Sequence, residues 1–248
     1  MNQITLRQYS DPKREHLAEI AKIYLNKSDD DPRRPLRLIE QGHTAFLKSQ
    51  FVRFEYQTSA VAYSHLATYS LANGTPPLEL RACQSLRATK GANVYIPDET
   101  RHPKIVTAVV EQNFDDYVEL LEEEKPQVAR YAAPQGTMVK YTLSWSFLLL
   151  AKHFFPERLW TPGALPETKE VAEEMWFLVA EQDRELWQVI YEQYGPHRGK
   201  ESKAMDYLRK NKSLDVKELQ SQLQSVDPQM SAYDWLLNRF GKNKSMWE

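Results

Sequence analysis

The chain contains a single cysteine, Cys83, among its 248 residues. One cysteine excludes an internal disulfide framework, a zinc site built on cysteines and a CxxC redox pair. A nucleophilic Cys83 assisted by a distant histidine is one hypothesis, but a lone cysteine is more often an inert, buried residue. None of the 8 glycines lies in a GxGxxG fingerprint or a Walker-type loop. The sequence therefore lacks the common redox, zinc and phosphate-loop signatures.

Long apolar runs and an excess of one charge are also missing. The longest apolar run, residues 147–151, is far shorter than the ~20 residues that a membrane span needs. The N-terminal residues lack the apolar stretch of a secretion signal, so a cytoplasmic protein is expected. The net charge of −2 gives no electrostatic reason for binding nucleic acid. The 6 histidines never recur at metal-ligand spacing, so no metal site is predicted.

The apolar pattern predicts a chain in which strands alternate with amphipathic helices. Ser10-Asp11-Pro12 places a capping residue before a proline, which is typical of a helix start, and Gly42 suits a helix end. Apolar residues alternate in 51–57, so Val52 and Phe54 are expected on one face of a strand. Strands are predicted at 2–9, 51–57 and the start of 140–155, helices at 13–25, 36–42, 58–72, 103–124, the end of 140–155 and 166–193, and extended or irregular structure at 78–97.

Composition divides the chain into a body and an extension. Residues 1–195 have the length of one large domain, and GPHRGKESK at 195–203 is typical of a hinge. Residues 196–248 are predicted to form a helical C-terminal extension, with ten Lys and Arg against seven Asp and Glu. We expect an apolar cluster in this extension to dock on the body or on a neighbouring subunit: Trp235, Leu236, Leu237 and Phe240.

Ser85 and Arg87 are candidate ligand-binding residues. In an extended segment, residues two apart lie on the same face, so the Ser85 hydroxyl and the Arg87 guanidinium would converge. Such a pair suits a phosphate group. An arginine engaged in an ordinary salt bridge explains the same pattern.

Several longer strings occur in the order typical of one known family. They are ITLRQYSDPKREHLAEIAKIYL, EQGHTAFLKSQFVRFEY, CQSLRATKGANVYIPDE, ARYAAPQGTMVKYTLSWSFLLLAKHFFPERL and ALPETKEVAEEMW. Over residues 2–190 the chain therefore resembles the flavin-dependent thymidylate synthases, the ThyX family.

The resemblance implies both a fold and a reaction. The fold would be α/β (α+β), with a ThyX-like mixed sheet flanked by long helices, assembled as a homotetramer whose subunits share active sites. FAD would be the cofactor, with NADPH and methylenetetrahydrofolate as co-substrates. The reaction would be reductive methylation of a pyrimidine deoxynucleotide at C5, of the dUMP to dTMP type.

The family signature R-H-R-x-x-S-x-N-E-x-S-x-R-Y assigns roles to individual residues. Its last part matches Ser85 and Arg87, which would bind the nucleotide, with Arg87 as the catalytic residue. Arg158 would be a further nucleotide contact. The resemblance places His43, Ser70 and Arg81 on the side of the flavin.

Other signature positions differ from the family. Arg-His-Arg falls on residues 68–70 or 75–77, which carry no positive charge, and the glutamate position is Cys83. Family arginines fall on Leu150 and on Leu159, or on Arg158 with a shift of one residue, and a family glutamine falls on Leu165. Apolar residues at 150 and 165 are expected of a site repacked as core. Two alternatives therefore stand beside the synthase: a non-catalytic structural, regulatory or pairing subunit for an intact homologue, and a related enzyme acting on a different nucleotide.

Overall fold

The computed structural model describes residues 2–72, 82–83, 93–97, 102–160 and 163–196. Within them, four strands form one sheet in the order β1-β2-β4-β3. The strands are β1 (Gln3–Tyr9), β2 (Phe51–Ser59), β3 (Ala82–Cys83) and β4 (Met138–Ser146). Each neighbouring pair is antiparallel, so the described part of the sheet does not show the expected mixture of strand directions.

The two faces of the sheet differ as the alternation in β2 predicts. Val52, Phe54 and Tyr56 are buried, while the residues between them are partly exposed. Helices cover the buried face: the Tyr56 hydroxyl lies 3.5 Å from the Met175 sulfur, and the Trp145 ring lies 4.7 Å from that of Phe154. We call this the inner face, and the opposite one the outer face.

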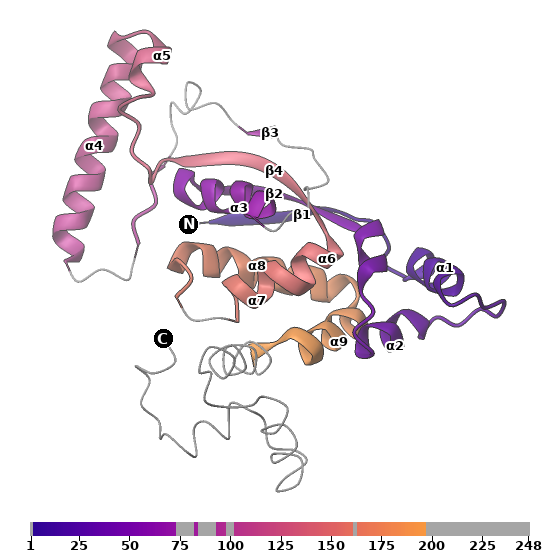
Figure 1. The fold of residues 1–248 in the computed structure, drawn as a ribbon. Coiled ribbons are helices and arrows are strands. Elements are labelled where there is room, and N and C mark those ends of the chain that lie inside the picture. Colours follow the sequence, from indigo (N-terminus) through magenta and orange to yellow (C-terminus); the bar gives the residue numbers. More distant parts are fainter. Residues whose placement is uncertain (1, 73–81, 84–92, 98–101, 161–162, 197–248) are drawn as a thin grey trace, which may run out of the picture.

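The covering helices follow one another in the chain after β4 (Figure 1). Ser146 caps the first by accepting a hydrogen bond from the Leu149 amide at 3.1 Å. The elements are α6 (Phe147–Leu149), a π-helical segment (Leu150–Phe154), α7 (Phe155–Arg158), α8 (Pro166–Gln182) and α9 (Arg184–Tyr194). Together with α3 (Ala60–Ala72), which contacts β2, β4 and α8, they enclose the main apolar core.

Two predicted helix boundaries are wrong for the same physical reason, namely capping by a buried aspartate. The single helix predicted at 166–193 is broken at Asp183, whose carboxylate accepts a hydrogen bond from the Leu186 amide at 3.1 Å and starts α9. Asp11 does not occupy the first position before α1 (Glu15–Tyr24). Arg14 does, with a φ of 58°, and the Asp11 carboxylate instead accepts from the Leu17 amide at 2.8 Å.

The predicted helix end at Gly42 is confirmed. After α2 (Arg34–Glu40), Gly42 has a φ of 82°, which glycine adopts without strain. Its amide donates to the Ile39 carbonyl, and the His43 amide donates to the Leu38 carbonyl, each at 2.8 Å. These two bonds form a Schellman motif, which fixes the backbone of His43. A 3-10 turn, η1 (Ala45–Ser49), leads from there into β2.

The long helix α4 (Pro103–Glu123) and the short α5 (Pro126–Ala129) project away from the sheet (Figure 1). Most acidic residues of α4 are exposed, as expected for a solvated face. Among the described helices, none has the length and apolar character required to cross a bilayer. The α+β class with flanking long helices is thus confirmed. The predicted C-terminal extension lies outside the described residues, and the boundary at 195 stays a prediction.

Candidate functional site

The outer face of the sheet carries a polar, positively charged strip. Arg53 of β2 lies opposite Ser144 of β4, and its Nε donates to the Ser144 hydroxyl at 3.2 Å. Lys140, which pairs with Gln57 four residues further along β2, is exposed. The carboxylate of Glu55 accepts from Arg7 at 3.0 Å, and this bond holds the pKa of Glu55 below its ordinary value. The strip therefore carries guanidinium and ammonium groups, which suit an anion.

The edge strand β3, which pairs with β4 beside this strip, lies in sequence among three of the predicted site residues. In β3, Ala82 pairs with Thr142 and Cys83 pairs with Tyr141. In the sequence, Arg81 directly precedes β3, and Ser85 and Arg87 follow it. Arg81, Ser85 and Arg87 themselves lie outside the described residues, and so does the side chain of Ser70 in α3.

The environment of Cys83 differs from the one that the sequence predicts. The inert, buried cysteine predicted from composition is wrong, because Cys83 is exposed on β3. The edge position explains the exposure, since β3 has β4 on one side and is the last strand in the sheet order.

A hydroxyl network supports β3 from the inner face. The Tyr141 and Thr58 hydroxyls are 2.7 Å apart, and the Tyr141 ring stacks on Tyr56 at 4.8 Å and meets the edge of Tyr63 at 4.7 Å. Burial raises the pKa of Tyr141 above its ordinary value, so the phenol is neutral. This network fixes Tyr141, the residue of β4 with which Cys83 of β3 pairs.

A buried carboxylate joins this region to the helical layer. Glu167, 3% exposed, accepts from the Ser59 amide at 2.9 Å and from the Ser59 hydroxyl at 2.5 Å. The same hydroxyl accepts from the Ala62 amide at 3.1 Å, which caps α3. Burial raises the pKa of Glu167, and the two bonds from Ser59 oppose that shift. Glu167 therefore ties the start of α8 to the junction of β2 and α3.

His43 and Arg158 are predicted site residues whose side chains the structure describes. His43 is exposed, and its ring lies 6.0 Å from Tyr24 of α1. Arg158 ends α7 and is half-buried. They belong to different parts of the helical layer, since α2 packs on α1 and α9 whereas α7 packs on α8.

The apolar substitutions at family positions fall into two environments. Leu150 lies in the π-helical segment, is fully buried and belongs to the main core. Leu159 packs against that core. Leu165 precedes α8 and is 37% exposed, so the expectation that it is core is wrong, while that for Leu150 is confirmed.

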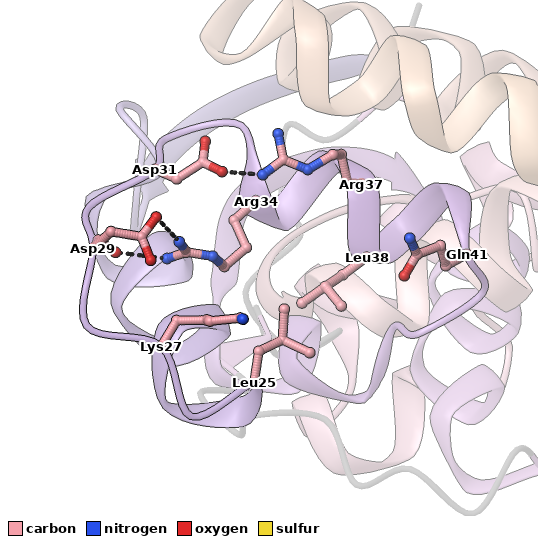
Figure 2. A pocket seen from close by; sticks show the side chains of 8 residues that line it. All are labelled: Leu25, Lys27, Asp29, Asp31, Arg34, Arg37, Leu38 and Gln41. Carbon is pink, nitrogen blue, oxygen red and sulfur yellow. Dashed lines mark hydrogen bonds and ion pairs between the residues drawn. The ribbon is translucent and has the colours of Figure 1, made fainter.

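A separate cavity of about 270 Å³ lies between the loop after α1 and helix α2 (Figure 2). Figure 2 shows Arg34 directed at Asp29, with a 2.6 Å ion pair, and Arg37 paired with Asp31. Its arginines are thus already neutralised by carboxylates of the same loop. Of the predicted site residues whose side chains the structure describes, neither His43 nor Arg158 lines this cavity.

Apolar periodicity does not indicate the role of Glu167 or of the Thr58–Tyr141 pair. A glutamate in the first turn of a helix is commonly exposed there, where it complements the helix dipole. Its burial depends on Ser59, which is 108 residues away in the chain.

Comparison with known proteins identifies the relatives. Residues 5–183 match the family described as thymidylate synthase complementing protein. No curated protein matches the sequence. The fold is similar to that of the UMP/dUMP methylase PolB from Streptomyces cacaoi bound with 5-Br dUMP, with a TM-score of 0.63 and 18% identity, covering 79% of this chain and 96% of that chain. It is also similar to thymidylate synthase X (ThyX) from Helicobacter pylori with FAD and dUMP, with a TM-score of 0.60 and 15% identity, covering 77% of this chain and 99% of that chain.

The likeness to the two solved structures shows a shared fold. The family match is broader evidence, because it spans well over half of the chain and contains β2, β3, β4 and most of β1. It confirms the resemblance to ThyX that the local strings predict. The chain belongs to the thymidylate synthase complementing protein family.

Proposed function

We propose that this protein binds a pyrimidine nucleotide and methylates its base at C5. The observation that carries the proposal is the match to the methylase PolB, of which 96% is covered by the fold of this chain. The other solved relative is a ThyX with dUMP. Both proteins are solved with a pyrimidine nucleotide or its 5-bromo analogue, and the present chain retains almost their whole framework.

The nucleotide would lie at the outer face beside β3. There Ser85 and Arg87 would bind the nucleotide and its phosphate, and Arg87 would be the catalytic residue. Arg158 ends α7 in the helical layer on the other side of the sheet, so as a further nucleotide contact it would come from a neighbouring subunit of the homotetramer. Arg53 and Lys140 support this placement, because they bring positive charge to the outer face of β2 and β4, and β4 pairs with β3. A phosphate on this face would gain charge-assisted hydrogen bonds.

FAD is the cofactor that family membership implies, with NADPH and methylenetetrahydrofolate as co-substrates. His43, Ser70 and Arg81 would lie on the side of the flavin. The described cations of the outer face fit a phosphate-bearing group, although the Arg-His-Arg positions carry no charge. When bound, the flavin supplies the redox chemistry, and the chain's own residues orient and bind the nucleotide. A homotetramer with shared sites would complete each site.

The buried position of Leu150 favours a second function. If a nucleotide-binding arginine of the family has become part of the core, the protein is a non-catalytic homologue that pairs with an intact synthase. An enzyme for a different nucleotide is the remaining alternative. The outer-face cations favour nucleotide binding over a purely structural role.

Calorimetric titration with dUMP and with UMP tests the proposal. The wild-type chain should bind at least one of them, and Arg87→Ala should weaken binding tenfold or more, since a hydrogen bond to a charged group contributes about 1.5–3 kcal/mol. Arg37→Ala is the matched control, because Arg37 pairs with Asp31 beside the separate cavity. Equal affinity of the wild-type and Arg87→Ala chains would refute the role of Arg87. Absence of binding to both nucleotides would refute the function.

A further inference from the structure

Three aromatic rings from different elements meet at the surface of the helical layer. Trp160 follows α7, Trp176 lies on α8 and Tyr191 lies on α9. The Trp160 ring is 5.1 Å from Trp176 and 5.5 Å from Tyr191, in edge-on contacts. Tyr191 is 38% exposed, and both tryptophans are partly exposed. We call these three residues the aromatic patch.

The helices that carry the patch are strongly acidic. Helices α8 and α9 expose six glutamates against two basic residues, Lys169 and Arg184. Arg14 neutralises one of these glutamates, at a distance of 2.6 Å. The exposed glutamates are Glu170, Glu173, Glu174, Glu181, Glu185 and Glu192. A partner for this surface should therefore be apolar in part and basic.

The C-terminal 52 residues of the same chain have those properties. They lie beyond the family match, which ends at residue 183, and they carry ten basic against seven acidic residues. Near their end, Tyr233, Leu236, Leu237 and Phe240 recur at spacings of three, one and three. That spacing is one apolar face of an amphipathic helix.

We propose that residues 231–241 form a helix that docks on the aromatic patch of its own chain. The described chain ends at Pro196, directly after α9, so the extension starts beside the patch. The 36 residues between Pro196 and Tyr233 span about 35 Å as a flexible chain, which lets the segment return. A tethered segment also has an effective concentration in the mM range, which favours its own chain over a separate one.

Hydroxyl-radical labelling of the full-length protein tests the docking through the side chain of Tyr191. Leu237→Asp should increase the labelling of Tyr191 and Trp160 several-fold, because the docked helix shields both rings. Asn238→Asp adds the same charge on the other side of the predicted helix and should leave the labelling unchanged. Equal labelling of Tyr191 in the wild-type and Leu237→Asp chains would overturn the proposal.

A variant of the aromatic patch tests the same contact from the other side, through deuterium uptake in the C-terminal tail, residues 197–248. Tyr191→Ser should increase deuterium uptake in residues 229–242, whereas Tyr131→Ser, at an 83% exposed tyrosine next to α5, should not. If uptake is the same in all three proteins, the patch does not hold the tail.

Carbodiimide cross-linking separates the possible occupants. In a mixture of isotopically light and heavy chains, cross-links between tail lysines such as Lys242 and the glutamates of α9 should join residues of equal isotope label. Light-to-heavy cross-links would assign the tail to a second copy and overturn docking on its own chain.

Discussion

At the scale of the residue, Glu167 shows how one buried side chain organises a large part of the site. Its carboxylate contacts both donors of Ser59, and Ser59 in turn caps α3. Burial raises its pKa, so the folded protein favours the protonated form. The contribution of Glu167 to stability is then greatest below the ordinary pKa of glutamate, and it is lost as the pH rises through the raised value.

Two substitutions separate hydrogen bonding from charge at this position. Glu167→Ala should destabilise the fold by about 1–3 kcal/mol, because the amide and hydroxyl of Ser59 lose their buried acceptor. Glu167→Gln keeps an acceptor and cannot ionise, so its stability relative to wild type should increase with pH. Urea unfolding at several pH values between about 4 and 8 measures both effects. A Glu167→Gln chain whose stability follows that of the wild type at every pH would contradict this account. Glu170→Gln, at an exposed site on the same helix, is the control.

At the scale of the element, the break between α8 and α9 depends on Asp183. This carboxylate is 6% exposed, caps α9 through Leu186 and lies 3.0 Å from the Arg14 guanidinium. No glycine or proline marks the position, and Val179 and Leu186 are seven residues apart, which is the spacing of one helix face. Asp183 therefore links the start of α9 to Arg14 at the start of α1. The helix break depends on this tertiary contact as well as on local capping.

Removing this carboxylate should therefore cost more than a cap alone. Asp183→Ala should lower the free energy of unfolding by more than the ~1 kcal/mol typical of a lost cap, since Arg14 also loses a partner. Asp183→Asn keeps the acceptor and should cost less. Asp30→Ala, which breaks the exposed pair with Lys22, should change stability by less than about 1 kcal/mol. Equal unfolding midpoints for Asp183→Ala and Asp30→Ala would contradict the assignment.

Features that depend on neighbouring residues are predicted from the sequence, and features that depend on distant residues are not. Alternation placed Val52 and Phe54 on the buried face of β2, and a glycine marked the end of α2, because both signals are local. The burial of Glu167 and the break at Asp183 depend on residues distant in sequence, which a pattern of neighbours does not contain. The strings shared with the ThyX family predicted the family. The positively charged strip of the outer face is seen only in the structure, because it depends on the pairing of β2 with β4, which places Arg53 opposite Ser144.

At the scale of the whole molecule, α4 and α5 carry exposed apolar side chains. Ile105 is 64% exposed, and Val109 and Val128 are each 53% exposed. Ile105 and Val109 lie one helical turn apart on α4. We propose that a second subunit of the homotetramer covers this surface of α4.

A charge on this surface should disrupt the assembly. Ile105→Asp should shift the protein to a smaller species, measured by light scattering after size-exclusion chromatography, because an unpaired carboxylate would be buried in the contact. Ile23→Asp is the matched control, at a 72% exposed isoleucine on α1. An Ile105→Asp chain with the mass of the wild type would exclude α4 from the interface.

The visible absorption spectrum of the protein after equilibration with FAD tests the central claim most directly. The account predicts that flavin elutes with the protein and that adding dUMP or UMP changes the shape of its absorption bands, because nucleotide and flavin would occupy one site. A colourless protein that leaves all FAD free would contradict flavin-dependent methylation and support the non-catalytic homologue.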